Sequence, residues 1–376
     1  MVSRWLKWIG WIVVLGGLNN VMAKGEAQPG TLTPYRWIMA DTLPREGQGW
    51  TETAAPYDRL PSKAKSQVRD ELWTLSQHSA GMVIPFISNS RTIVVRWKLR
   101  FNFKLTHMTG SGIRGLDLYA FDSLTNQWRY VGTGRPDSLV NQKTVGRNMT
   151  PADRRFQLYL PLYDGIDSLA IGIDSGAYLR PDRNQDQLPL VFYGTSITQG
   201  CSASRPGMAY PAIIGRWLNR KTINLGFSGN GRMDMALADL IGELPSEMII
   251  LDCLPNLTLE QITTNVQPFI IRLRQLQPET PILLVENVLF PPMWSDTSLH
   301  YAITHKNNLL KQEYQELLEK GYRNIHYVEA ENLIGQDGET AVDGTHLTDI
   351  GMQRIAEQLA DRITSILKTR RHPDED

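Results

Sequence analysis

Hydrophobic and polar side chains alternate along short segments in the first half of the chain. Residues 93–103 alternate in this way, and residues 116–121 repeat the pattern before a polar turn at 122–126. Further strand-like runs occupy residues 128–131, 156–160 and 169–173. Alternation with a period of two is typical of a strand with one buried face. Because helical periodicity is scarce here, residues 35–176 predict an antiparallel β-sandwich of jelly-roll type.

The pattern changes after a polar segment at residues 177–187, which we expect to link two domains. From residue 188 to residue 368, short apolar runs alternate with helical periodicity. The strand-like runs are 191–193, 222–225, 248–251, 282–285 and 325–328, and the helical segments lie at about 208–219, 233–244, 258–276, 302–320 and 348–368. Five strands that are each followed by a helix predict an α/β fold with a doubly wound parallel sheet of the flavodoxin type. Ligands of such sheets bind at the carboxyl ends of the strands.

The first 23 residues have the features of a secretory signal peptide. Arg4 and Lys7 supply positive charge, residues 9–18 form an apolar core, and residues 21–23 suit a cleavage site. An uncleaved membrane anchor is the alternative, although the apolar run is short for a bilayer span. We therefore expect a secreted or periplasmic protein without a stable membrane anchor after cleavage. The 39 basic and 39 acidic residues form no basic stripe, which argues against a nucleic-acid partner.

A serine follows the first strand-like run of the second half, where an α/β fold can expose a reactive group. Residues 191–200 read VFYGTSITQG, in which the buried-strand pattern breaks at Gly194 and Ser196 comes two residues later. We take Ser196 as the candidate nucleophile. Because a serine hydroxyl is a weak nucleophile by itself, the hypothesis requires a base, a carboxylate that orients the base, and donors for an oxyanion.

A histidine and an aspartate lie close together just before the last helical segment. Asp343 and His346 are three residues apart with a glycine between them, so one turn can bring the carboxylate to the imidazole. His300, His305 and His326 are alternative bases, but the last two have no aspartate at suitable spacing. No two histidines have the spacing of helical metal ligands and the two cysteines are far apart, so we expect no metal site.

Two further strand ends offer hydrogen-bond donors. Gly229 lies in the glycine-rich stretch after residues 222–225, and glycine lets a backbone N–H approach a ligand closely. Asn256 follows residues 248–251 and places an amide side chain at the next strand end. The alternatives are a tight turn for Gly229 and helix capping or a glycosylation site for Asn256.

These candidates form an ordered set, with a serine, a glycine and an asparagine after successive strands and Asp-x-x-His before the last helix. In this respect residues 188–368 resemble the SGNH (GDSL-type) hydrolase superfamily. The run GTSI at residues 194–197 stands at the Gly-Asp-Ser-Leu block, with threonine in place of aspartate. The run LPNL at residues 254–257 stands at the asparagine block and departs from the usual Gly-x-Asn-Asp. The set also differs from the Gly-x-Ser-x-Gly elbow of α/β-hydrolases.

The resemblance implies hydrolysis of an ester through an acyl-enzyme, without a cofactor. Ser196 would attack the carbonyl carbon, His346 would take and return the proton, and Asp343 would hold the imidazole. The backbone N–H groups of Ser196 and Gly229 and the side chain of Asn256 would form the oxyanion hole. Protonation of His346 should lower the activity at acid pH.

A β-sandwich ahead of such a domain in an exported chain is similar to the arrangement in carbohydrate esterases that remove acetyl groups from polysaccharides. The expected substrate is therefore an acylated carbohydrate or another small ester; a lipid or lysophospholipid hydrolase and a non-catalytic glycan-binding protein are the alternatives. Arg205, Tyr210 and Glu286 lie in or beside the expected strand-end surface and are candidate substrate-binding residues, with structural roles as the alternative. Cys201 and Cys253 are expected near the same surface, either as a disulfide or as two buried thiols.

Overall fold

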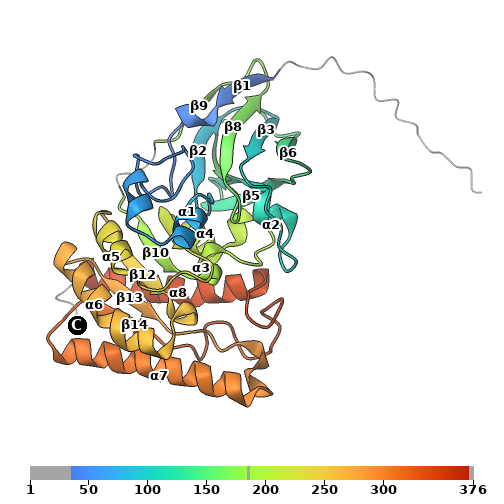
Figure 1. Ribbon diagram of the computed structural model, residues 1–376. Helices are drawn as coiled ribbons and strands as arrows, with labels where there is room; N and C mark the ends of the chain where they lie inside the picture. Colours follow the sequence, from blue (N-terminus) through green and yellow to red (C-terminus); the bar gives the residue numbers. More distant parts are fainter. Residues whose placement is uncertain (1–34, 184–186, 372–376) are drawn as a thin grey trace, which may run out of the picture. The chain divides into compact units, whose positions relative to one another are not determined.

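The amino-terminal part of the protein is a β-sandwich of two antiparallel sheets (Figure 1). A computed structural model describes residues 35–183 and 187–371, and the predicted signal peptide lies outside those residues. The strands of the sandwich are β1 Arg36–Met39, β2 Val83–Ser88, β3 Ile93–Leu99, β4 Leu116–Asp122, β5 Gln127–Gly134, β6 Val140–Gly146, β7 Arg154–Tyr159, β8 Ile166–Ile173 and β9 Leu179–Pro181. One sheet has the order β1-β8-β3-β6 and the other β5-β4-β7-β2-β9. The predicted sandwich is confirmed.

The core of the sandwich follows the alternation of the sequence. Inward-facing side chains of both sheets, such as Trp97 on β3, form one hydrophobic cluster. β3 ends at Leu99, earlier than the predicted end at residue 103. The chain leaves the sheet there because the carboxylate of Asp164 accepts hydrogen bonds from the backbone N–H groups of Phe101 and Phe103, at 2.9 and 2.8 Å.

Four strands of the sandwich, β1, β2, β6 and β9, have no counterpart in the sequence prediction. β2 is buried along nearly its whole length and β6 is mostly polar, so neither strand shows clear alternation. β9 lies within the segment predicted as a linker and pairs with β2 in antiparallel orientation. The sandwich therefore continues into part of that segment.

The carboxyl-terminal part is an α/β domain around a five-stranded parallel sheet, as predicted. Its strands are β10 Leu190–Gly194, β11 Thr222–Gly226, β12 Met248–Asp252, β13 Ile282–Val285 and β14 Ile325–Val328. Their order, β11-β10-β12-β13-β14, is that of a flavodoxin-like sheet. Every residue of β10 and β12 is buried. The strands are continuous hydrophobic runs because helices cover both faces of the sheet.

Two groups of helices cover these faces (Figure 1). The helices are α3 Ser196–Gln199, α4 Tyr210–Leu218, α5 Met235–Gly242, α6 Leu259–Leu276, α7 Thr297–Glu319 and α8 Asp349–Arg371. α4 and α8 pack on the face that carries Phe192, whereas α5 and α6 pack on the face that carries Tyr193. α7 contributes buried residues to both clusters. α7 begins before the predicted residue 302 because the side chain of Asp296 caps it by accepting a hydrogen bond from the N–H of Leu299.

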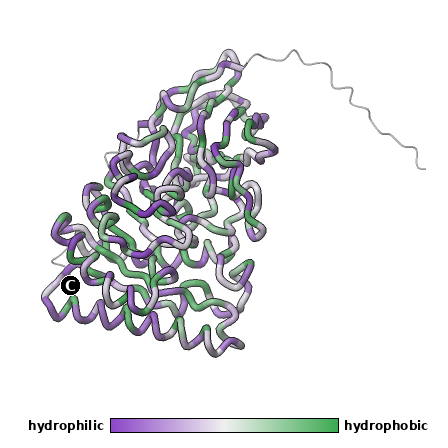
Figure 2. The backbone as a smooth tube through the Cα atoms, in the orientation of Figure 1, coloured by the Kyte–Doolittle hydropathy of each residue, from purple (hydrophilic) through white to green (hydrophobic). Residues whose placement is uncertain are grey.

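The hydropathy of the chain agrees with this layering. Figure 2 shows apolar positions gathered along the strands of the parallel sheet, whereas α7, at the bottom of the view, is largely hydrophilic. Ile303, Leu310 and Leu317 form a buried stripe along α7, at the spacing of two helical turns. Among the described residues, no helix is both long and apolar enough to cross a bilayer.

The sandwich and the α/β domain belong to one compact unit. The guanidinium of Arg59 is buried and donates hydrogen bonds to the carbonyl oxygens of Asn224 and Gly226, at 3.2 and 2.6 Å. Leu72, on helix α1 (Asp70–Ser76), joins the hydrophobic cluster beneath α5 and α6. The amino-terminal part of the chain therefore packs directly against the end of β11, next to the candidate serine strand.

Candidate active site

Ser196 is the first residue of α3 and lies just beyond the carboxyl end of β10. The side chain of Thr195 caps the helix by accepting a hydrogen bond from the N–H of Ile197 at 3.2 Å. Gly200 ends the helix with φ of 106°, in the left-handed region that favours glycine. The residues around the serine thus build a one-turn helix that presents its hydroxyl at the strand end.

The structure brings Ser196, Asp343 and His346 together. Nε2 of His346 lies 3.0 Å from Oγ of Ser196, and Nδ1 of His346 lies 2.8 Å from Oδ2 of Asp343. Oδ1 of Asp343 accepts hydrogen bonds from the backbone N–H groups of Thr345 and His346, at 3.0 and 2.8 Å. The imidazole therefore stands between a hydroxyl and a fixed carboxylate, which is the arrangement that activates a serine for nucleophilic attack.

The pKa values of the imidazole and the carboxylate are shifted in opposite directions. Burial acts to raise the pKa of Asp343, but hydrogen bonds from the ring and the backbone of His346 and from the N–H of Thr345 outweigh it and hold the pKa at about 2. The pKa of His346 is raised to about 9, and interaction with Cys201 is the largest cause. Burial of the ring acts to lower this pKa, and interaction with Asp343 adds to the rise. The carboxylate is therefore ionised at neutral pH, and the neutral form of the imidazole becomes abundant towards pH 9.

The two predicted oxyanion donors stand at the ends of the strands that flank β10. Gly229 follows β11 and has φ of 69°, again in the region that favours glycine. Asn256 follows β12, and its Oδ1 accepts a hydrogen bond from the N–H of Gly231 at 3.2 Å. This bond turns the amide oxygen of Asn256 towards the loop after β11. The strand order brings both loops to the edge of the sheet that carries Ser196.

Hydrogen bonds from the sandwich hold the segment that follows α3. The hydroxyls of Thr109 and Ser111 donate to the carbonyl oxygen of Ser204, at 2.6 and 2.7 Å. The N–H and the hydroxyl of Ser204 donate in turn to the carboxylate of Asp349, at 2.8 and 2.5 Å. Asp349 begins α8, three residues after His346. Ser204 therefore connects the sandwich to the serine helix on one side and to the histidine loop on the other.

A fully buried carboxylate on β4 reinforces this connection. Asp117 accepts hydrogen bonds from Nη1 of Arg205 and from the N–H of Gly207, at 2.8 and 2.9 Å. The hydroxyl of Thr133 also donates to Asp117, at 2.5 Å, and Nη1 of Arg205 donates to the hydroxyl of Tyr119 at 2.6 Å. The loop after Ser204 is thus anchored in the sandwich by a desolvated ion pair.

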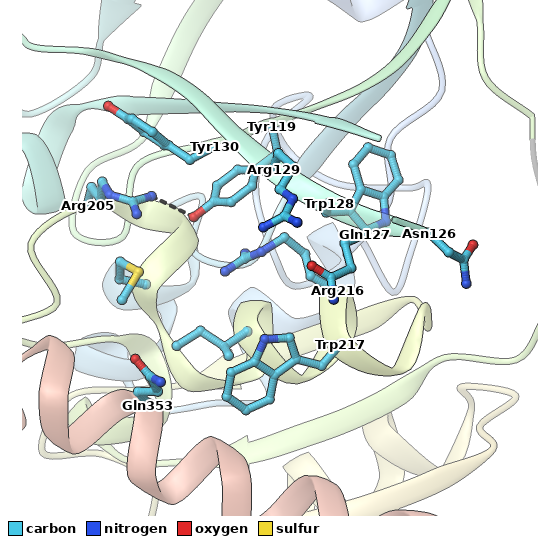
Figure 3. A pocket seen from close by; sticks show the side chains of 12 residues that line it. Tyr119, Asn126, Gln127, Trp128, Arg129, Tyr130, Arg205, Arg216, Trp217 and Gln353 are labelled. Atoms are coloured by element: carbon cyan, nitrogen blue, oxygen red, sulfur yellow. Dashed lines mark hydrogen bonds between the residues drawn. The ribbon is translucent and has the colours of Figure 1, made fainter. Parts of the chain in front are cut away.

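The structure does not place the three candidate substrate-binding residues beside the triad. Arg205 lines a cavity of about 580 Å³ of which His346 is not a lining residue. Figure 3 shows its guanidinium bonded to the hydroxyl of Tyr119 at one end of this cavity. Tyr210 is fully buried, and its hydroxyl donates to Asp252 at 3.0 Å. Glu286 is nearly buried and accepts a hydrogen bond from the hydroxyl of Tyr327 at 2.6 Å. All three side chains therefore have hydrogen-bond partners within the protein.

The alternative bases are engaged elsewhere in the α/β domain. The ring of His305, on α7, stacks on Tyr301, with centroids 5.6 Å apart. Nε2 of His326, on β14, lies 3.1 Å from Oδ1 of Asn324. His300 also lies on α7. Of these histidines and His346, only His346 has a hydrogen bond to the candidate serine among the described residues.

A cavity of about 440 Å³ opens beside the triad, and His346 is part of its wall. The amino-terminal half of the chain contributes Leu75, Phe103, Leu105 and His107 to this wall, and the α/β domain contributes Cys201 and Ser228 among others. The apolar side chains of this part of the wall are Leu75, Phe103 and Leu105. Both halves of the protein therefore shape the space next to the hydroxyl of the candidate nucleophile.

A second group of reactive side chains lies at this cavity; sequence reasoning placed Cys201 near Ser196 but missed His107. Cys201 and Cys253 are both free buried thiols, so the structure excludes the disulfide alternative. Nε2 of His107 lies 3.3 Å from Sγ of Cys201, and the rings of His107 and His346 stack with centroids 5.0 Å apart. The short spacing between Ser196 and Cys201 was a signal for the thiol. No local pattern distinguishes His107, because it lies on an irregular segment of the sandwich.

Two family models match the chain. Residues 187–364 match the GDSL-like Lipase/Acylhydrolase family, and residues 35–179 match a model called GxDLY, described as the N-terminus of Esterase_SGNH_hydro-type. The motif in that name reads GLDLY at residues 115–119 of this chain, and its aspartate is the buried Asp117. No curated protein sequence matches the chain.

Several solved structures are similar over most of the chain. A protein from Bacteroides ovatus ATCC 8483 described as a GDSL-like lipase is 33% identical with a TM-score of 0.85, and the match covers 89% of this chain and 98% of that one. The salicylyl-acyltransferase SsfX3 from a tetracycline biosynthetic pathway is 18% identical with a TM-score of 0.70, covering 88% and 97%. A family two carbohydrate esterase from Clostridium thermocellum, in complex with cellohexaose, is 14% identical with a TM-score of 0.55, covering 77% and 93%. At these identities the last two matches show a shared fold.

Proposed function

Since the chain belongs to the GDSL-like lipase/acylhydrolase family, with the amino-terminal domain of SGNH-type esterases, we propose that it is a serine esterase acting on O-acetylated carbohydrates. The family membership confirms the resemblance expected from the ordered sequence blocks. The observation that carries the proposal is the placement of His346 between Ser196 and Asp343, at 3.0 and 2.8 Å. These distances are those of a base that can take a proton from the serine while a carboxylate holds it.

The reaction proceeds in two halves around the imidazole. Oγ of Ser196 attacks the ester carbonyl carbon as Nε2 of His346 takes its proton, and Nδ1–H remains hydrogen-bonded to Asp343. His346 then gives the proton to the leaving alcohol, so the ester C–O bond breaks and the acyl group stays on Ser196. In the second half a water molecule gives a proton to His346 and attacks the acyl carbon. The carboxylic acid leaves and the serine regains its proton.

The strand ends on either side of β10 stabilise the negative oxygen of each tetrahedral intermediate. The donors are the backbone N–H groups of Ser196 and Gly229 and the side-chain amide of Asn256. The bond from Gly231 to Oδ1 of Asn256 keeps the orientation of that amide fixed before the substrate binds. A donor of this kind contributes ~3 kcal/mol to stabilisation of the transition state.

The choice of an acetylated carbohydrate is supported by the fold shared with the family two carbohydrate esterase that was crystallised with cellohexaose. A second candidate within the same chemistry is hydrolysis of esters with longer acyl chains, such as lipids. Leu75, Phe103 and Leu105 in the wall of the cavity favour this candidate, because an acetyl group fills little of about 440 Å³. Hydrolysis rates for nitrophenyl esters of acetate and octanoate separate the two: the proposal predicts faster turnover of the acetate.

The main test is release of acetate from acetylated oligosaccharides by the wild type and by Ser196→Ala. We expect the variant to lose roughly 10⁵-fold in kcat, because no other group takes over the acyl transfer. Ser228→Ala is the matched control, since Ser228 lines the same cavity but is not the hydroxyl bonded to His346. Its kcat should stay within about tenfold of the wild type. Equal rates for wild type and Ser196→Ala would remove the serine from the mechanism.

Export to the periplasm or the medium is a further part of the proposal. It rests on the charged start, the apolar core and the cleavage-type residues within the first 23 positions. Amino-terminal sequencing of the protein from a cell that expresses the full chain tests it. A mature protein that begins just after residue 23, found outside the cytoplasm, is the expected result, and an intact start in the cytoplasm contradicts it.

A further inference from the structure

Three side chains with metal-binding atoms converge at the cavity beside the triad. His107 comes from the sandwich, Cys201 follows α3, and His346 precedes α8. One ring nitrogen from each histidine and the sulfur of Cys201 all lie within 4.8 Å of one another. Nε2 of His107 and Sγ of Cys201 are already 3.3 Å apart. The proposed ester hydrolysis uses neither His107 nor Cys201.

Two imidazoles and one thiolate form a donor set that suits zinc. Zn²⁺ prefers nitrogen and sulfur ligands in a tetrahedron, and three protein ligands leave its fourth position for water. Neighbouring ligand atoms around such an ion are ~3.5 Å apart. The distance between His107 and Cys201 already meets this value. The three atoms lie within 4.8 Å of one another, so the wider separations must shrink by about 1 Å. Because the rings of His107 and His346 stack with an angle of 18° between their planes, one ring must also rotate until its lone pair points at the shared ion.

We propose that His107, Cys201 and His346 form an inhibitory site for a borderline-soft divalent cation, of which Zn²⁺ fits best. The inhibition rests on the proposed function, because it requires His346 to be the base of the esterase. Nδ1 of His346 is held by Asp343, so the nitrogen left for a metal is Nε2. That is the same atom that bonds to Oγ of Ser196. A bound cation and the proton of the serine therefore compete for one lone pair.

The binding step is a ligand exchange without a change of oxidation state. The S–H bond of Cys201 breaks, its proton goes to solvent, and the sulfur binds the cation as a thiolate. Both imidazoles donate through neutral nitrogens, so a proton carried by Nε2 of His346 also goes to solvent, and water molecules leave the cation. The cavity of about 440 Å³ provides the route to the sulfur, because Cys201, His107 and His346 all line it. Removal of the cation by a chelator restores the free lone pair on Nε2.

The first experiment detects binding without any substrate. Chelator-treated, full-length folded protein is titrated with Co²⁺, which takes the place of Zn²⁺ and gives thiolate-to-metal absorption in the near ultraviolet when sulfur is a ligand. We expect this absorption in the wild type and in Ser196→Ala, and we expect its loss in Cys201→Ser. His107→Gln should weaken the affinity roughly 10–100-fold. His300→Gln is the matched control on exposed α7 and should leave the titration unchanged.

The second experiment measures ester hydrolysis with and without a few equivalents of Zn²⁺, each variant being compared with its own metal-free rate. The wild type and His300→Gln should lose about tenfold or more of their activity and recover it with chelator. His107→Gln and Cys201→Ser should lose less than about twofold at the same Zn²⁺ concentration.

The two readouts separate failure of the metal site from failure of the proposed function. If the wild type gives no thiolate absorption, or if Zn²⁺ inhibits all variants equally, the metal site is wrong even in an active esterase. If Co²⁺ binds through Cys201 but Zn²⁺ leaves hydrolysis unchanged, the inhibitory role is wrong. If metal-free protein hydrolyses no ester, the proposed function fails, and the cobalt absorption still decides whether the site exists.

Discussion

The two halves of the protein contribute different things to the same crevice. The α/β domain supplies the groups assigned to the reaction, with Ser196 after β10 and His346 before α8. The sandwich supplies contacts that hold these groups in place, such as the hydrogen bond that Thr109 donates to the loop after α3 and the one that Asp117 accepts from it. It also supplies much of the apolar wall of the cavity. The reacting groups therefore come from the α/β domain, and contacts that position them come from the sandwich.

This division predicts that mutations in the two halves damage different properties. Substitution of a reacting group in the α/β domain should abolish turnover and leave the folded protein as stable as before. Substitution of an anchoring group in the sandwich should lower the stability and leave most of the turnover. The experiments below test each side of this comparison.

After Ser196→Ala, the largest effect on turnover is expected for Asp343→Asn. An amide in this position can hold the imidazole in the wrong tautomer, so Nε2 of His346 would carry a proton and could not accept one from Ser196. We expect kcat to fall roughly 10⁴-fold, while the melting temperature changes little. Ester hydrolysis and thermal unfolding of the purified variant measure the two quantities.

Asp337→Asn is the matched control for Asp343→Asn. Asp337 precedes Asp343 by six residues and forms an exposed ion pair with Arg354, at 2.7 Å. Its loss should change kcat by less than about twofold. A variant Asp343→Asn with near wild-type kcat would show that the carboxylate does not orient the base.

The pH dependence of kcat/KM should show the raised pKa of His346. The imidazole accepts the serine proton when it is neutral, and a pKa of about 9 leaves the protonated form dominant at pH 7. With chelator present, kcat/KM should therefore rise roughly 100-fold between pH 6 and pH 8. Because Cys201 is the main cause of the shift, Cys201→Ser should move the midpoint to lower pH. A profile that is flat over this range would contradict the role of His346 as the base.

The smallest effect on turnover is expected for Asp117→Ala, on the sandwich side. This change leaves Arg205, the N–H of Gly207 and the hydroxyl of Thr133 without the buried carboxylate. We expect the free energy of unfolding to fall by about 3 kcal/mol and kcat to fall less than about tenfold. Denaturant unfolding and initial rates below the melting temperature measure the two effects.

Asp137→Ala is the control for Asp117→Ala. Asp137 lies on the same domain and pairs with Lys143, but its side chain is 73% exposed. Its removal should change the stability by less than about 0.5 kcal/mol. If Asp117→Ala abolished turnover without lowering the stability, the sandwich would have a direct part in the chemistry, and the division described above would be wrong.

The same division explains what could be predicted from the sequence. The periodicity of residues 188–368 indicated the five strands and their helices, and the carboxyl ends of parallel strands meet at one edge whatever lies between them. Ser196, Gly229 and Asn256 follow neighbouring strands, and Asp343 and His346 share a loop. Their approach could therefore be expected without knowledge of any long-range contact.

The contributions of the sandwich could not be predicted in this way. His107 lies on an irregular segment whose path depends on the carboxylate of Asp164, which caps the chain at Phe101 and Phe103. Arg205 was a candidate for substrate binding because it follows the serine helix. Its actual partner, Asp117, lies on a strand of the other domain. A contact between residues that are distant in sequence and lie in different domains leaves no periodic pattern in the sequence.

The most direct test of the central claim is the identity of the nucleophile. The folded wild-type protein is treated with a fluorophosphonate, which phosphonylates activated serines with loss of fluoride, and the labelled residue is located by mass spectrometry of its peptides. The account predicts one adduct, on Ser196, that disappears when Asp343→Asn or Ser196→Ala is treated in the same way. An adduct on Ser228 or Cys201, or no adduct on protein that still hydrolyses esters, would contradict it.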